Sequence, residues 1–230
     1  MEQLIFELAR PEPPAFGNFV AGANREALTS LGQMAKGELR ETGLVLWGAA
    51  GAGKTHLLRA TVTAAAAAGR VAVYVEHPAA APALPPASGA LLAVDAVDAA
   101  DADAQGRLFT LYNALAAAGG QLVAAAAVAP ARMQLRDDLR TRFGYGLVYE
   151  ILPLADGDKA AALEGYAHSR GFRLSGDVIA YLLAHGRRDM ATLVATLTAL
   201  DRHSLATKRP VTVPLLREWL QRQIALDAGR

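Results

Sequence analysis

The chain contains no cysteine, which excludes a disulfide framework and any thiolate metal site. It also lacks a charge excess: the formal net charge is +1 and the pI is about 8.1, so we do not expect the basic surface of a major DNA-binding protein. Hydrophobic residues make up 53% of the chain, but many are alanine, and no run reaches the roughly 18 apolar residues of a membrane-spanning helix. The first residues lack the basic segment of a secretion signal. We therefore expect a cytoplasmic protein without a membrane segment, whose 230 residues form one large or two small domains.

A glycine-rich motif occupies residues 48–55, which read Gly-Ala-Ala-Gly-Ala-Gly-Lys-Thr and fit the phosphate-binding pattern G-x-x-x-x-G-K-[ST]. It follows an apolar run at 44–47 and precedes a segment rich in helix formers at 55–68, the context that such a loop requires. There Lys54 neutralises the β- and γ-phosphate oxygens, and the Thr55 hydroxyl coordinates Mg²⁺. A chance glycine-rich turn is the alternative. The predicted nucleotide-binding residues are Gly48, Ala49, Ala50, Gly51, Ala52, Gly53, Lys54 and Thr55.

Strand-like and helix-like segments alternate between residues 44 and 152, as in a parallel α/β sheet. A helix after the third strand is expected to begin at Asp101 or Asp103 and to run to about Ala118. After Pro153 the apolar residues follow helical spacing and predict about four helices. Strands are expected at 44–47, 71–75, 91–94, 122–128 and 147–152, and the expected divisions of the chain are 1–10, 11–153 and 154–230.

Three segments resemble the AAA+ family, in its DnaA-like branch. Residues 51–58, Gly-Ala-Gly-Lys-Thr-His-Leu-Leu, are similar to the phosphate loop of the replication initiator DnaA, which adds His56 to the nucleotide site. Residues 16–22 look like the family's segment leading into the adenine pocket, and residues 140–147 look like the segment whose arginine reaches a neighbouring subunit's nucleotide. The resemblance covers nearly the whole chain. It implies an α/β fold, with an AAA+ P-loop parallel sheet domain followed by a small helical lid domain, and ADP or ATP with Mg²⁺ as the ligand.

The chain also departs from DnaA, which carries a basic helix-turn-helix domain after its lid. Here the sequence stops at Arg230, soon after an expected lid helix around Trp219. The lid sequence at 187–193, Arg-Arg-Asp-Met-Ala-Thr-Leu, together with the expected absence of a DNA-binding domain, resembles the regulatory members of the branch. The resemblance implies a role in controlling replication initiation.

Asp95 ends the third expected strand and matches the Walker B aspartate, which holds Mg²⁺ through its water shell opposite Thr55. A simple strand-end cap is the alternative. Ala96 stands where hydrolysing AAA+ proteins carry a second acid, and the fourth strand is apolar where the family places a polar sensor of the γ-phosphate. Asp98 is a candidate substitute for the acid, although its place three residues on favours the loop. We therefore expect very slow intrinsic ATP hydrolysis.

Two arginines complete the charge chemistry implied by the resemblance. Arg142 is the arginine finger, acting in trans on a partner's ATP, and Arg188 is the lid arginine contacting this chain's own nucleotide. A guanidinium suits both tasks because it keeps its charge and grips phosphate oxygens in bidentate fashion. A solvated helix residue or a surface ion-pair partner is the alternative for each, and Arg140 and Arg187 are the neighbouring candidates.

The N-terminal peptide at residues 3–8 resembles the short clamp-binding peptide of DNA sliding-clamp partners. Leu4, Phe6 and Leu8 suit apolar clefts, and the Gln3 amide makes directional hydrogen bonds. A first β-strand with the three apolar side chains on one face is the alternative.

Two functions remain open from the sequence. In the first, the protein binds ADP and the sliding clamp, contacts DNA through the clamp, and stimulates hydrolysis of ATP bound to DnaA. In the second, it is a self-hydrolysing loader-like or initiator-like ATPase that remodels a partner or DNA. Ala96 favours the first. Both leave room for a homo-oligomer.

Overall fold

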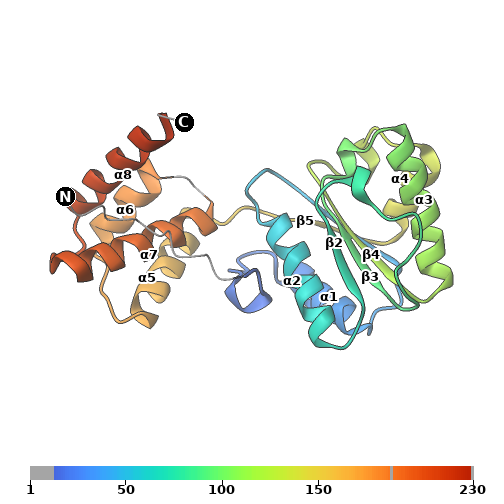
Figure 1. Ribbon diagram of the computed structural model, residues 1–230, viewed down its shortest axis with the longest axis horizontal. Helices are drawn as coiled ribbons and strands as arrows, with labels where there is room; N and C mark the ends of the chain where they lie inside the picture. The colour runs from blue at the N-terminus through green and yellow to red at the C-terminus, as the bar shows by residue number, and fades with distance from the viewer. Residues whose placement is uncertain (1–12, 187–188, 229–230) are drawn as a thin grey trace. The chain divides into compact units, whose positions relative to one another are not determined.

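The computed structural model describes residues 13–186 and 189–228, and the chain divides into two compact units (Figure 1). The first unit is Pro13–Pro153, and the second begins at Leu154. Among the described residues, no helix is long and apolar enough to cross a membrane.

A five-stranded parallel sheet with the order β2-β3-β4-β1-β5 forms the centre of the first unit. Strands β3, β4 and β1 are buried along nearly their whole length, which explains their continuous apolar sequences. The predicted α/β class is therefore confirmed. The strands are β1 (Gly43–Trp47), β2 (Ala72–Val75), β3 (Leu91–Val94), β4 (Gln121–Ala126) and β5 (Leu147–Glu150).

Two strands end two residues earlier than the sequence predicted. After β4, the N–H of Ala127 donates to the carboxylate of Asp98 at 2.9 Å instead of extending the strand. After β5, the N–H of Leu152 donates to Asn24 Oδ1 at 2.8 Å, and the Asn24 amide donates back to the Leu152 carbonyl. Side chains from other segments therefore take over the backbone groups at the carboxyl edge of the sheet.

Helices cover both faces of this sheet (Figure 1). On one face lie α1 (Arg25–Lys36) and α2 (Lys54–Ala67), and on the other lie α3 (Ala102–Ala117) and α4 (Asp137–Tyr145). Each pair of helices packs its buried side chains against its own face of the sheet. Asp101 caps α3 by accepting the N–H of Ala104, so the first of its two predicted caps is the one used. Four short 3₁₀ turns are also described: η1 (Phe16–Asn18), η2 (Pro78–Ala80), η3 (Val97–Ala99) and η4 (Pro130–Arg132).

The described part of the second unit consists of four helices. Their apolar stripes meet in one core, as the helical spacing predicted. The helices are α5 (Asp156–Ser169), α6 (Gly176–His185), α7 (Met190–Thr207) and α8 (Val213–Ala228), and the core includes Leu163, Ile179, Leu182, Leu197, Leu200 and Leu216.

A cavity of about 460 Å³ lies at the amino edge of the sheet, around Arg70. The Arg70 guanidinium donates to the carbonyl of Gly89, to that of Met34 at the end of α1, and to Gln121 Oε1. The Gln121 amide in turn donates to the carbonyls of Leu39 and Glu41. This network joins the end of α1 to the loops that precede β1 and β3 and to the first residue of β4, so Arg70 has a structural role.

Candidate nucleotide-binding site

The predicted phosphate loop connects β1 to α2, and close packing requires glycine at two of its positions. A Cβ on Gly48 would lie 2.5 Å from the carbonyl oxygen of Ile151, and one on Gly53 would lie 2.6 Å from Phe19 Cε2. Both residues also have positive φ, 146° and 101°. The second contact places the loop beside the segment 16–22, which the sequence linked to the adenine pocket.

Lys54 is the first residue of α2 and its side chain turns back along the loop. Its Nζ donates to the carbonyls of Gly48 at 2.7 Å and Ala49 at 2.9 Å. Burial lowers the pKa of Lys54, and the negative charges of Asp95 and Asp98 oppose that shift. The ammonium therefore lies inside a loop at a helix N-terminus, where the helix dipole and free N–H groups favour an anion.

Thr55 and Asp95 meet beside this ammonium. The Thr55 hydroxyl donates to Asp95 Oδ2 at 2.6 Å, and the Asp95 carboxylate also accepts the N–H of Ala96 through Oδ1 at 2.9 Å. A hydroxyl and a carboxylate in contact are a donor set that fits Mg²⁺, a hard cation that takes part of its coordination from phosphate and water. The described residues contain no group of three or more histidine, cysteine, aspartate or glutamate side chains arranged for a metal.

Two residues follow Asp95 at this edge, Ala96 and Asp98. Ala96 adopts a left-handed conformation, with φ 50° and ψ 42°, and offers only a methyl group, in line with the sequence, which has no second acid at this position. Asp98 lies in η3, and its carboxylate accepts the N–H of Ala127 just after β4, while its charge acts on Lys54. It therefore faces the strand ends rather than the loop, which corrects the orientation expected from spacing.

His56 points toward the N-terminal side of the site. Its Nε2 lies 3.0 Å from the carbonyl oxygen of Ala15, and its ring centroid lies 5.5 Å from that of Phe19. The His56 side chain therefore packs against the segment 13–24. Among the remaining loop residues, Ala49, Ala50 and Gly51 are exposed and Ala52 is buried.

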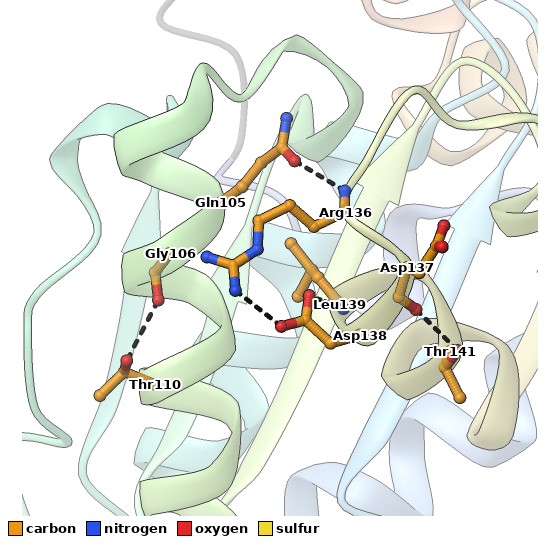
Figure 2. Close-up of polar contacts among 8 residues, drawn as sticks. All are labelled: Gln105, Gly106, Thr110, Arg136, Asp137, Asp138, Leu139 and Thr141. Carbon is orange, nitrogen blue, oxygen red and sulfur yellow. Dashed lines mark hydrogen bonds and ion pairs between the residues drawn. The ribbon is translucent and has the colours of Figure 1, made fainter.

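Helix α4, which carries Arg142, is fixed at its base by a set of polar contacts (Figure 2). Gln105 Oε1 of α3 accepts the N–H of Arg136 at 2.8 Å, and the Arg136 guanidinium pairs with Asp138 at 2.8 Å. Figure 2 also shows the Thr141 hydroxyl donating to the Asp137 carbonyl one turn earlier. These contacts and the apolar packing of the buried side chains of α4 hold the helix in one orientation.

The two arginines near the end of α4 have different surroundings. Arg140 pairs with Asp137 at 2.6 Å. Arg142 is exposed and makes no hydrogen bond or ion pair with another described residue. Its charge acts on Tyr112, whose pKa is raised by burial and lowered in part by Arg142. Arg142 is thus presented from a rigid helix without a partner among the described residues.

Five predicted residues lie outside the part of the chain that the structure describes: Gln3, Leu4, Phe6, Leu8 and Arg188. Arg187, the neighbouring candidate, lies outside it as well.

The sequence analysis missed two residues at this site. Tyr74 of β2 places its hydroxyl 3.2 Å from Asp95 Oδ2, and Arg59 of α2 lies over the Tyr74 ring, with its Cζ 4.5 Å from the centroid. A polar aromatic residue near the carboxyl end of a strand was the available signal. The hydrogen bond between Tyr74 and Asp95 depends on the pairing of β2 with β3, which the sequence alone did not give.

Comparison with known proteins places these features in a family context. Residues 156–220 match the family described as "Hda, lid domain". Domain III of the replication initiation protein DnaA from Thermotoga maritima has a TM-score of 0.72 and 20% identity, covering 92% of this chain and 97% of that chain. AMPPCP-bound DnaA from Aquifex aeolicus has a TM-score of 0.68 and 21% identity, covering 83% of this chain and 65% of that chain. A RuvB variant from Thermotoga maritima has a TM-score of 0.69 and 14% identity, covering 91% of this chain and 72% of that chain. The predicted AAA+ fold with a helical lid is confirmed, and the match at residues 156–220 supports the resemblance to the DnaA-like branch in the lid.

Proposed function

We propose that this Hda-like, DnaA-related AAA+ protein binds ADP or ATP with Mg²⁺ and regulates the initiation of chromosome replication. The observation that carries the proposal is the phosphate loop, in which Lys54 lies at the start of α2 beside the Thr55–Asp95 pair. The similar DnaA structure from Aquifex aeolicus carries AMPPCP, which supports an adenine nucleotide as the ligand. We place the protein in the cytoplasm.

The nucleotide acts mainly as a structural ligand, with ADP as the expected working form. Lys54 exchanges its two loop carbonyls for phosphate oxygens, and Thr55 and Asp95 hold Mg²⁺. The methyl side chain of Ala96 cannot orient an attacking water, so the chain's own hydrolysis of ATP is very slow.

Arg142 acts on the nucleotide of a partner, ATP-bound DnaA. Its guanidinium is exposed, and α4 is braced against α3 (Figure 2), so it reaches a neighbouring phosphate without first breaking an ion pair to another described residue. Charge that develops on the transferring phosphoryl group is stabilised by such an arginine, which typically accelerates hydrolysis by about 10³ to 10⁵. Loss of ATP from DnaA is the regulatory output. Arg188, from the lid, contacts the chain's own nucleotide.

The N-terminal peptide tethers the protein to the DNA sliding clamp. Gln3, Leu4, Phe6 and Leu8 provide the amide and apolar side chains that such a groove takes. DNA is therefore contacted through the clamp, consistent with a net charge of only +1. Self-association into a homo-oligomer is compatible with this arrangement.

A self-hydrolysing ATPase that remodels a partner or DNA is the second candidate. The Asp98 carboxylate favours it, because it faces the carboxyl edge of the sheet and acts electrostatically on Lys54. Turnover by the isolated chain of several ATP per second, within the range of ordinary enzymes, would support this candidate and contradict the regulatory one.

The decisive experiment follows the decay of DnaA-bound ATP in the presence of clamp loaded on DNA. Wild type is expected to accelerate decay, and Arg142→Ala is expected to lose about 10³-fold or more of that acceleration while keeping its fold and its own nucleotide. Arg140→Ala is the matched control, because Arg140 lies on the same helix but is paired with Asp137. Undiminished decay with Arg142→Ala, or loss with Arg140→Ala alone, contradicts the assignment of the finger.

Replacing Gln3, Leu4 and Phe6 by alanine should remove clamp binding without unfolding the protein.

A further inference from the structure

Tyr74 connects the edge strand β2 to the aspartate of the candidate Mg²⁺ site. Its hydroxyl donates to Asp95 Oδ2, the same oxygen that accepts the Thr55 hydroxyl. The parallel pairing of β2 with β3 sets this distance, because Tyr74 is opposite Ala93 and the N–H of Asp95 donates to the Val75 carbonyl at 2.9 Å. The two strands therefore deliver the phenol to the carboxylate directly.

Three donors surround the Asp95 carboxylate. Oδ1 accepts the N–H of Ala96, and Oδ2 accepts the hydroxyls of Thr55 and Tyr74. Thr55 is itself expected to coordinate Mg²⁺, so its hydroxyl has two tasks. Tyr74 has one, which is to fix the direction of Asp95 Oδ2. Partners that orient a metal-binding carboxylate in this way typically contribute about 10- to 100-fold to metal affinity.

Arg59 holds the Tyr74 ring from the exposed side of α2. Its guanidinium lies 4.5 Å from the ring centroid, a cation–π distance. Burial raises the pKa of the Tyr74 hydroxyl, and Arg59 opposes this shift. An ordinary phenol is protonated near neutral pH, so the Tyr74 hydroxyl acts as a hydrogen-bond donor to the carboxylate.

We propose that Tyr74 is a positioning residue for Asp95, with Arg59 as the support of its ring, and that the two together set how tightly Mg²⁺ is held with the nucleotide. The proposal rests on the nucleotide-binding function proposed above. It assigns a role to two residues outside the phosphate loop. It does not depend on whether the partner is DnaA or whether Arg142 acts in trans.

The test measures ADP affinity by calorimetry, with Mg²⁺ present and with EDTA, for the full chain. Tyr74→Phe removes one hydroxyl and keeps the ring over which Arg59 lies. The gain in ADP affinity that Mg²⁺ provides is expected to fall about 10-fold, while affinity in EDTA stays unchanged. Arg59→Gln is expected to change the same quantity in the same direction by about 2- to 3-fold, as for an exposed cation–π contact.

Tyr149→Phe is the matched control. Tyr149 is a phenol on β5 whose hydroxyl pairs with Ser30 Oγ at 2.8 Å, on the opposite edge strand of the same sheet. It is expected to leave both affinities unchanged. Thermal unfolding of all three variants verifies that each is folded.

Each outcome decides the proposal. Equal losses with and without Mg²⁺ for Tyr74→Phe mean that the phenol only packs the edge strand, and an unchanged Mg²⁺ effect means that it does not position Asp95. Either result overturns this inference and leaves the proposed function in place. Wild type that binds no ADP under either condition overturns both.

Discussion

Two cations of the sheet unit, Lys54 and Arg70, both donate to backbone carbonyls but lie at opposite edges of the sheet. Lys54 sits at the start of α2, where the helix dipole disfavours a positive charge, and donates to carbonyls of its own loop. Arg70 follows α2 in the chain, but its guanidinium reaches the C-terminal end of α1, where a positive charge is favoured, and joins separate segments. We therefore expect Lys54 to exchange its hydrogen bonds for phosphate oxygens when nucleotide binds, and Arg70 to keep its hydrogen bonds in the folded protein.

The backbone also differs between the two edges. At the amino edge the left-handed positions are glycines, as at Gly37, Gly69 and Gly119. At the carboxyl edge the positive-φ residues of the phosphate loop are glycines too, but the left-handed residue after Asp95 is Ala96. Strain from a residue with a side chain is retained where the candidate site lies, which is typical of functional sites.

The largest expected effect is the loss of nucleotide binding in Lys54→Ala. Removing the ammonium should weaken ADP binding by about 100-fold or more, because charge-assisted hydrogen bonds to phosphate are lost. Unfolding in the absence of nucleotide should change little. Calorimetry gives the first quantity and urea unfolding the second. If Lys54→Ala lowered the free energy of unfolding as well as the ADP affinity, Lys54 would have a structural role like that of Arg70, and the contrast between the two edges would be wrong.

Arg70→Met should have the reverse pattern. The carbonyl of Gly89 and Oε1 of Gln121 lose the guanidinium donor, the carbonyl of Met34 keeps only the N–H of Gly37, and the free energy of unfolding is expected to fall by about 2 kcal/mol. ADP affinity of the folded fraction should stay the same. Arg40→Met is the control, because Arg40 lines the same cavity but is exposed. Equal destabilisation by both variants would show that the network around Arg70 has no special role.

Ala96→Gly tests the strain at the carboxyl edge. Glycine adopts a left-handed conformation without a Cβ penalty, so the unfolding free energy should rise by about 1 kcal/mol. Ala100→Gly, at a nearby extended position, should instead lower it, because glycine gains conformational freedom in the unfolded chain. A decrease in both would mean that Ala96 is not strained.

The smallest effect concerns pH. In the folded protein the pKa of Lys54 is lower than the ordinary value of 10.5, which applies to the unfolded chain. At a pH between the folded and the unfolded pKa, the unfolded chain binds more protons than the folded protein, so the free energy of unfolding rises with pH. The gain is expected to be under about 1 kcal/mol, since the group is partly solvated. Tyr74 and Tyr112 have raised pKa values and act in the opposite direction only above 10.0. Urea unfolding from about pH 8 to 10 should show the rise in wild type and not in Lys54→Met.

Much of the sheet unit was predictable because its signals are local. The apolar runs that became β1 and β3 are continuous and end in a glycine loop or an aspartate, so their positions along the chain follow from a few residues each. Helices α1 and α4 were not predicted. Helix α4 has only two buried residues, Leu139 and Phe143, so its apolar pattern is short. The roles of Arg142 and of the N-terminal peptide came from family resemblance and stay predictions.

The sequence by itself determined the phosphate loop, the α/β class and the helical lid, since glycine, apolar periodicity and turn residues act over short spans. Only the tertiary structure decided which distant side chains meet. The strand order places β3 next to β2 and β4, and this brings Tyr74 and Ala127 to the two acids Asp95 and Asp98. Strand pairing between segments far apart in the chain is set by the register and packing of the whole sheet, which no short span of residues encodes.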